Sequence, residues 1–210
     1  TAKLVDGALK GTGDVKLVVN GLSATNPPAG IYFPEMVMDL QIQPGRANVV
    51  IRTLQPGAAK VSVILGGEPV EEHPMQELHP AGLWETTVPG RSGLVYRLRI
   101  TDPEGRTRDE DDPYRFPSTL SDYDLHLLGE GTHYRVYDKL GAHPGRLDGV
   151  EGTIFAVWAP NARRVSVVGD WNGWDGRRHP MRLHPANGIW VLFLPAVGPR
   201  ARHKDEVVGP

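Results

Sequence analysis

The stretch VIRTLQPGAAKVSVI at residues 50–64 recurs, without a gap, as IFAVWAPNARRVSVV at residues 154–168. In both copies apolar residues alternate with other residues on each side of a turn signal, as they do in half-buried β-strands. The signal is Pro-Gly in the first copy and Pro-Asn in the second, and both dipeptides favour turns. Each copy therefore predicts a strand, a turn and a second strand.

The repeat extends along the chain. HPAGLWETTVPG at 79–90 corresponds to HPANGIWVLFLPAVG at 184–198, and a weaker correspondence links VYRLRI at 95–100 with RHKDEV at 202–207. Short strands at regular spacing, separated by turn signals, favour sandwiches over parallel βαβ units. We predict an all-β fold in which two tandem immunoglobulin-like β-sandwich modules are joined by a structured connector.

The connector between the two copies is too rich in aromatic residues to be a loose linker. Within it, Leu120, Tyr123, Leu127 and Leu128 have the spacing of one face of a short helix. We therefore expect the connector to include a short helix that packs through these residues.

The residues before the first copy have no repeat partner. VKLVVNGL at 15–22 and MVMDLQIQ at 36–43 are predicted strands, and TNPPAG at 25–30 is a predicted turn. The chain is thus divided into an unassigned segment of β character at 1–48, a first sandwich at 49–117, a connector at 118–150, and a second sandwich at 151–210 that we expect to be truncated.

Composition excludes several classes of function. The net charge of -2, without a concentrated basic stripe, argues against nucleic-acid binding. The chain has no cysteine, so disulfides and thiolate metal sites are excluded, which fits a cytoplasmic protein. No apolar run has the length of a membrane span. The histidines lack metal-ligand spacing and no glycine-rich loop has phosphate-binding spacing, so we expect neither a metal nor a cofactor.

Several motifs resemble the amino-terminal region of bacterial 1,4-α-glucan (glycogen) branching enzymes. They are DDPYRF (111–116), DLHLLGEGTHYRVYDKLGAHP (124–144), GTIFAVWAPNARRVSVVGDWNGWDGRRHPMRL (152–183) and GIW (188–190). The resemblance implies that the second module is a glycogen-binding-type sandwich. It also implies a role in the transfer of α-1,4-glucan chains into α-1,6 branches during glycogen biosynthesis.

The resemblance implies no catalytic residue in this chain. Branching enzymes use a retaining carboxylate pair within a (β/α)₈ barrel, which alone needs about 250 residues. The acidic run DEDD at 109–112 is interpreted as a solvated turn that closes the first sandwich rather than as a catalytic pair or a calcium site. We expect the chain to be inert alone, with α-1,4-glucan or glycogen and the catalytic barrel of the parent enzyme as its partners.

The predicted carbohydrate-binding residues are Trp174, Trp190, Lys204 and Asn172. The resemblance places a sugar-stacking tryptophan at Trp174 and a lysine that contacts sugar hydroxyls at Lys204, whereas Asn172 can serve a ligand or form the turn. Trp190 is either a ligand contact or a strand residue that packs. The other tryptophans are interpreted as packing residues: Trp171 inward from its turn, and Trp158 and Trp84 in the core.

The tail departs from the family pattern. His203 and Asp205 stand where the family has aromatic residues on either side of the lysine. Because a polar residue at an inward position reduces core burial, we expect the last strand to be frayed, rerouted or cut short.

The alternative function is a structural module that braces the barrel without binding sugar. Exposed, clustered tryptophans would favour sugar binding, and buried tryptophans with an apolar patch would favour bracing.

Overall fold

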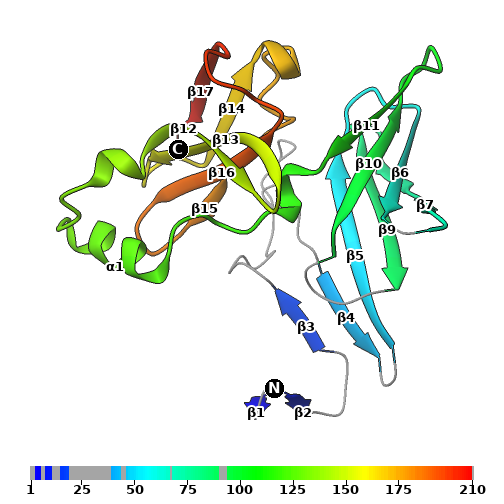
Figure 1. Cartoon of the computed structure of the whole chain (residues 1–210), viewed down its shortest axis with the longest axis horizontal. Helices are drawn as coiled ribbons and strands as arrows, with labels where there is room; N and C mark the ends of the chain where they lie inside the picture. Colours follow the sequence, from blue (N-terminus) through cyan, green and yellow to red (C-terminus); the bar gives the residue numbers. More distant parts are fainter. Residues whose placement is uncertain are drawn as a thin grey trace. The chain divides into compact units, whose positions relative to one another are not determined.

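The computed structural model describes the backbone of residues 3–5, 8–10, 15–18, 39–43, 46–66, 68–89 and 94–209, and side chains from Asn48 onward within these ranges. The chain forms two compact units, Thr1–Glu110 and Asp111–Pro210. Antiparallel strands dominate both units, which confirms the all-β prediction (Figure 1). The turn predicted at 25–30 lies outside the described residues.

The first unit is a β-sandwich. One sheet has the strand order β3-β4-β5-β9-β8 and the other the order β11-β10-β6-β7, while β1 and β2 pair separately. The strands predicted within 15–22 and 36–43 are confirmed as β3 and β4. The strands are β1 (Lys3–Val5), β2 (Ala8–Lys10), β3 (Val15–Val18), β4 (Asp39–Gln43), β5 (Arg46–Leu54), β6 (Lys60–Leu65), β7 (Glu71–Pro74), β8 (Gln76–His79), β9 (Leu83–Pro89), β10 (Tyr96–Thr101) and β11 (Thr107–Asp111).

The core of this unit is formed by the inward residues of the two sheets. Ile51 of β5 and Trp84 of β9 meet Val63 of β6 and Leu98 of β10, and all four side chains are buried. At the acidic run, Asp109 pairs with Arg99 at 2.8 Å. The run belongs largely to strand β11 rather than to the solvated turn that we predicted.

The second unit contains a second sandwich with a connector layer. Its sheets have the strand orders β12-β13-β16-β15 and β14-β17. The elements are the 3-10 helix η1 (Pro113–Arg115), α1 (Asp122–Glu130), the 3-10 helix η2 (Val136–Asp138), β12 (Gly141–Leu147), β13 (Val150–Trp158), β14 (Arg164–Gly169), the 3-10 helix η3 (Asp170–Asn172), β15 (Arg182–His184), β16 (Ile189–Pro195) and β17 (His203–Val208).

The repeat in the sequence is a repeat in the strand register. In the first unit Lys60 lies opposite Thr101 where β6 pairs with β10. In the second unit its repeat partner Arg164 lies opposite Val208 where β14 pairs with β17. The last strand therefore forms and pairs over its whole length, so the expected fraying is wrong. Tandem sandwich modules follow directly from the two equivalent registers.

The β13–β16 sheet of the second unit is buried on both faces. Phe155 and Leu192 face the sandwich core with Val167 of β14. On the opposite face, Ala156 and Val191 pack beneath residues of the connector, which are Leu120, Leu125, Leu128 and Leu140. The connector is thus a third layer of this unit, beside β13 and β16 in Figure 1.

The connector helix α1 is confirmed, but its packing face differs from the prediction. Ser121 caps its first turn in a capping box with Asp124, and Gly131 ends it in the left-handed conformation at φ 70°. Leu120 and Leu128 pack onto the sheet as predicted. Tyr123 is 70% exposed, because it lies on the opposite side of the helix, and Leu125 occupies the buried side instead.

Candidate functional site

The turn that follows β14 presents the candidate site. Strand β14 ends at Gly169, η3 follows immediately, and Gly173 and Trp174 then take left-handed backbone angles of φ 64° and 61°. The amide of Trp174 donates to the carbonyl of Gly169 at 3.0 Å, which closes the turn. This fold of the DWNGW segment brings residues 170 and 174 together at the end of the strand.

Asn172 builds the turn from inside. Its side-chain oxygen accepts from the amide of Gly169 at 2.9 Å, and its side-chain nitrogen donates to the carbonyl of Val167 at 2.9 Å. The same nitrogen lies 2.8 Å from Nδ1 of His179, which therefore accepts as a neutral ring. Asn172 is buried, with 4% exposure, and these bonds favour the turn-forming alternative, while its contact with sugar stays a prediction.

His179 is suited to the acceptor role. Its burial, followed by the positive charge of Arg178, lowers the pKa of His179 to about 4. At neutral pH the ring is uncharged, so Nδ1 has the free lone pair that Asn172 needs. The fold of the turn is thus coupled to one half-buried, neutral imidazole.

Trp174 is the exposed aromatic residue of this turn, with 42% of its surface accessible. A bulky residue rarely adopts a positive φ, because its Cβ approaches the following carbonyl, at a cost of about 1–2 kcal/mol. The indole Nε1 donates to Asp170 Oδ1 at 3.0 Å, and Arg202 pairs with the other oxygen of Asp170 at 3.1 Å. The ring is therefore held at the surface in a defined orientation despite a strained backbone.

The layer beneath this turn is tightly packed. Trp171 turns inward, as predicted, and its ring lies 6.3 Å from that of Phe155. A Cβ at Gly169 would overlap the Trp171 ring and the carbonyl of Arg202, so only glycine fits. This close approach fixes the base of the turn from which Trp174 projects.

Lys204 lies on the sheet face that the loop after Trp174 crosses. It is exposed and sits opposite Val168 in the β14–β17 pair. Glu206, two residues on, shares this face, because alternate strand residues point the same way. The carboxylate of Glu206 lies where a Cβ of Gly176 would be, so the loop after Trp174 crosses this face. The structure thus brings the Trp174 loop and Lys204 to one face of the module.

Trp190 lies elsewhere. It is 6% exposed, belongs to the sandwich core, and donates its Nε1 to the carbonyl of Ala159 at 3.0 Å. Its burial favours the alternative of a strand residue that packs, while a sugar contact of Trp190 stays a prediction. Trp84 has the equivalent position in the first unit with the same 6% exposure, which confirms its core assignment.

Trp158 was predicted to be a core residue, and this is wrong. It is 64% exposed at the end of β13, where its Nε1 donates to the carbonyl of Asn187 at 3.2 Å. Its strand position assigns it to the connector face of the sheet, with Ala156, but here the connector leaves it uncovered. Asp170, His179 and Arg202 were also not predicted, because only the folded turn brings them to Asn172 and Trp174.

The tail substitutions are accommodated at the edge of the core. His203 meets the ring of Phe155 edge-on at 5.0 Å and so retains an aromatic contact. Asp205 lies opposite the fully buried Val167, and desolvation raises its pKa although His203 opposes the shift. Over the described ranges, no three His, Cys, Asp or Glu side chains gather as metal ligands. Those ranges also contain no helix of the length and apolarity that a membrane span requires.

The two units of the chain match two different protein-family models. Residues 40–114 match the family model of the alpha-1,4-glucan branching enzyme GlgB N-terminal domain, and residues 139–210 match carbohydrate-binding module 48 (isoamylase N-terminal domain). The chain is 51% identical to the 1,4-alpha-glucan branching enzyme GlgB of Rhodospirillum rubrum, over 79% of this chain and 22% of that protein. It is 55% identical to the GlgB of Rubrobacter xylanophilus, over 75% of this chain and 21% of that protein.

Among solved structures, the type I pullulanase of Bacillus subtilis complexed with maltose is similar at 15% identity and a TM-score of 0.29. The match covers 78% of this chain and 22% of the pullulanase chain. That likeness is too low to support an argument. The chain spans about a fifth of the length of the GlgB relatives. The two family matches and the identity of about one half place this chain in the branching-enzyme family, as its amino-terminal region with a GlgB N-terminal domain followed by a carbohydrate-binding module 48.

Proposed function

We propose that the chain binds α-1,4-glucan and positions it for branching, through the face of the second unit that includes Trp174 and Lys204. The single observation that best supports this proposal is the conformation of Trp174. A large aromatic ring is held partly exposed on a left-handed residue, where a glycine would be less strained. Such strain is typical of functional sites, and folding alone gives no reason for it.

The chemistry of the face suits a neutral sugar. The flat indole can stack on the apolar face of a glucose ring, while the indole edge stays bonded to Asp170. Lys204 offers donors, and the carboxylate of Asp170 offers acceptors, to sugar hydroxyls. One such contact is weak, but a polymer with many identical units raises the effective concentration at each site.

Branching is the activity of the whole enzyme, and we connect this chain with it only through its family. The relatives are named as branching enzymes, and we propose that the glucan bound here is the substrate or product of that chain transfer. A module that tethers the polymer near a catalytic barrel increases the local substrate concentration without taking part in bond cleavage. The catalytic barrel is the partner that this proposal requires.

The test is a titration of the folded chain with maltoheptaose and with glycogen, by calorimetry or affinity electrophoresis. The matched pair is Trp174→Ala and Trp158→Ala, since both tryptophans are exposed in the same unit. We expect binding to be lost in Trp174→Ala and retained in Trp158→Ala. Equal binding by both variants would remove Trp174 from the site.

The bracing function is the second candidate, and the exposure of Trp158 is the observation that favours it. An uncovered tryptophan at the end of a core strand suits a protein contact as well as a sugar. If the folded wild-type chain bound neither maltoheptaose nor glycogen, bracing would become the better function.

A further inference from the structure

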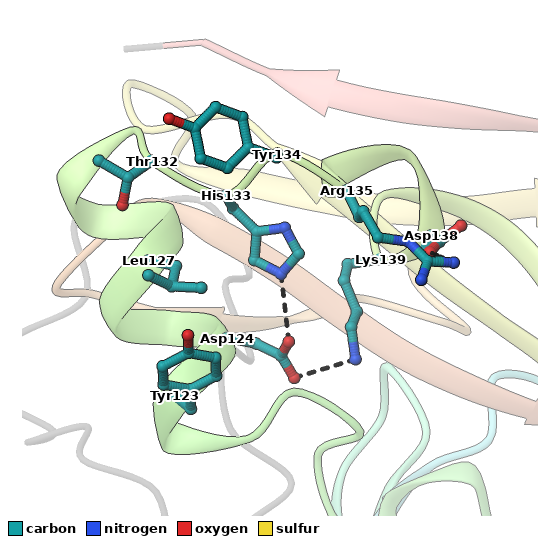
Figure 2. Close-up of a pocket in the computed structure, with 9 residues that line it drawn as sticks. All are labelled: Tyr123, Asp124, Leu127, Thr132, His133, Tyr134, Arg135, Asp138 and Lys139. Atoms are coloured by element: carbon teal, nitrogen blue, oxygen red, sulfur yellow. Dashed lines mark hydrogen bonds and ion pairs between the residues drawn. The ribbon is translucent and has the colours of Figure 1, made fainter.

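A hollow in the connector layer of the second unit is separate in sequence from the Trp174 turn. It has a volume of about 500 Å³, within the usual range of roughly 300–1,000 Å³ for small-molecule sites. Helix α1 forms one wall, and the loop from Thr132 to Lys139 forms the other (Figure 2). The two walls meet because Thr132 donates its amide back to the carbonyl of Leu127 at 2.9 Å.

The floor of the hollow is a polar cluster centred on Asp124. One carboxylate oxygen contacts Nε2 of His133 at 3.2 Å, and the other contacts Nζ of Lys139 at 3.0 Å and the hydroxyl of Ser121 at 2.7 Å. Burial alone would raise the pKa of Asp124, but the hydrogen bonds from Ser121, Lys139 and His133 together hold it well below its usual range. The floor is thus a fixed, ionised network that joins the helix start to the loop.

The rim of the hollow is aromatic. Tyr134 is 96% exposed and Tyr123 is 70% exposed. Figure 2 shows them on two sides of the Asp124 cluster, one on the loop and one on the helix. Two exposed tyrosines beside one hollow form an amphipathic surface that does not contribute to the core packing of this unit.

The charges of the hollow are balanced. Lys139 is paired with Asp124, and Arg135 is paired with Asp138 at 2.6 Å. An anion would have to displace one of these carboxylates, and a cation one of the basic groups, so neither gains net attraction. A neutral polyol instead donates to a carboxylate and accepts from a cation while both pairs persist.

We propose that this hollow is a second sugar-binding site, in which Tyr123 and Tyr134 contact glucose rings and the charge pairs bind their hydroxyls. The choice of α-1,4-glucan among neutral sugars rests on the proposed function, whereas the site itself does not depend on Trp174. Two sites on one unit would let a single long glucan chain bind twice and raise its avidity.

The experiment is a maltoheptaose titration of the ¹⁵N-labelled chain, followed through its backbone amide signals. In the Trp174→Ala variant, signals of Thr132–Lys139 should still shift as in the wild-type chain. Combined Tyr123→Ala and Tyr134→Ala substitution should weaken the binding reported by these signals by about two- to tenfold, the range of aromatic contact energies. Tyr137→Ala is the matched control, because Tyr137 is 65% exposed in the same connector and does not line the hollow.

The outcomes separate the two proposals. Shifts at 132–139 that persist in Trp174→Ala and weaken in the tyrosine variant support the second site, even if signals of residues 170–175 never respond. The second site is overturned if residues 132–139 stay silent at saturating maltoheptaose in a folded chain. It is also overturned if sodium sulfate reproduces their shifts, or if Tyr137→Ala weakens binding equally.

Discussion

Replacement of Trp174 by glycine should separate folding from binding. Glycine would relieve the left-handed strain, worth about 1–2 kcal/mol, at a cost of about 0.4–1 kcal/mol in unfolded-chain entropy. Loss of the exposed hydrogen bond to Asp170 costs a further 0.5–1.5 kcal/mol, roughly. These terms nearly cancel, so we expect the free energy of unfolding to stay within about 1 kcal/mol of wild type.

Binding should respond in the opposite way. Without the indole we expect maltoheptaose affinity to fall by about tenfold or more, which corresponds to about 1.4 kcal/mol. Urea unfolding followed by far-ultraviolet circular dichroism measures the first quantity, and calorimetric titration measures the second. Trp190→Ala is the control for a core tryptophan, since loss of its buried ring should cost about 3–5 kcal/mol. The reasoning is refuted if Trp174→Gly destabilises like Trp190→Ala, or if its affinity is unchanged.

Three further predictions concern polar groups of the second unit. The pKa of His179 is about 4 in the folded chain, below the unfolded value of about 6.5. The contribution of His179 to the free energy of unfolding should therefore fall as pH drops from 6.5 to 4, by at most about 3 kcal/mol. Urea titrations should show this loss reduced in His179→Gln, and equal pH dependence in both proteins would contradict it. Asp170→Ala should weaken maltoheptaose binding about two- to fivefold by releasing Trp174, with rescue by Asp170→Asn, and failure of that rescue would argue against the positioning role. Asp205→Leu, which copies Leu98 of the first unit, should raise the free energy of unfolding by about 0.5–1 kcal/mol at pH 7. Because desolvation raises the pKa of Asp205, the contribution of Asp205 to stability should fall as pH rises above 3.8, so the advantage of Asp205→Leu should grow over that range. An advantage that does not change with pH would contradict this.

The fold was predictable where the chain repeats itself. The register of β14 with β17 follows from that of β6 with β10, even though Asp205 replaces Leu98. Hydrogen bonds between strand backbones tolerate a changed side chain at the sheet edge, so the weaker third correspondence still specified a strand. The fraying that we expected gave too much weight to one polar residue, Asp205, which the structure leaves exposed.

The burial of Trp158 and Trp190 could not be predicted from the periodicity of their strands. Strands β13 and β16 are covered on both faces, so apolar residues run continuously and the period of two no longer reports which side faces solvent. Trp158 and Trp190 both lie in such runs, and one proved exposed while the other proved buried. Trp190 faces the sandwich core, whereas Trp158 lies on the connector side at the end of its strand, where the connector does not cover it. Sequence periodicity encodes neither the face that a residue takes in such a run nor how far the connector reaches.

Within the site, local chemistry was partly readable. Asn-Gly at 172–173 predicts a turn, and the structure confirms it with the left-handed Gly173. The pairing of Asp170 with Trp174 was not readable, because it requires a tryptophan at positive φ, which sequence rules disfavour. The feature that best indicates function is therefore the one that propensity would have rejected.

The comparison of the two modules locates this functional feature within the repeat. Val61-Ser62-Val63 and Val165-Ser166-Val167 occupy equivalent strands with buried side chains, so the sandwich framework is shared. The two modules diverge after these strands, where the second module alone has the DWNGW sequence. A framework common to both modules cannot explain a property of one, whereas a loop added to a rigid sheet can change function without altering the core. If the second module binds glucan as we propose, the binding should therefore reside in that loop and in the lysine of the neighbouring strand, and not in the sandwich itself.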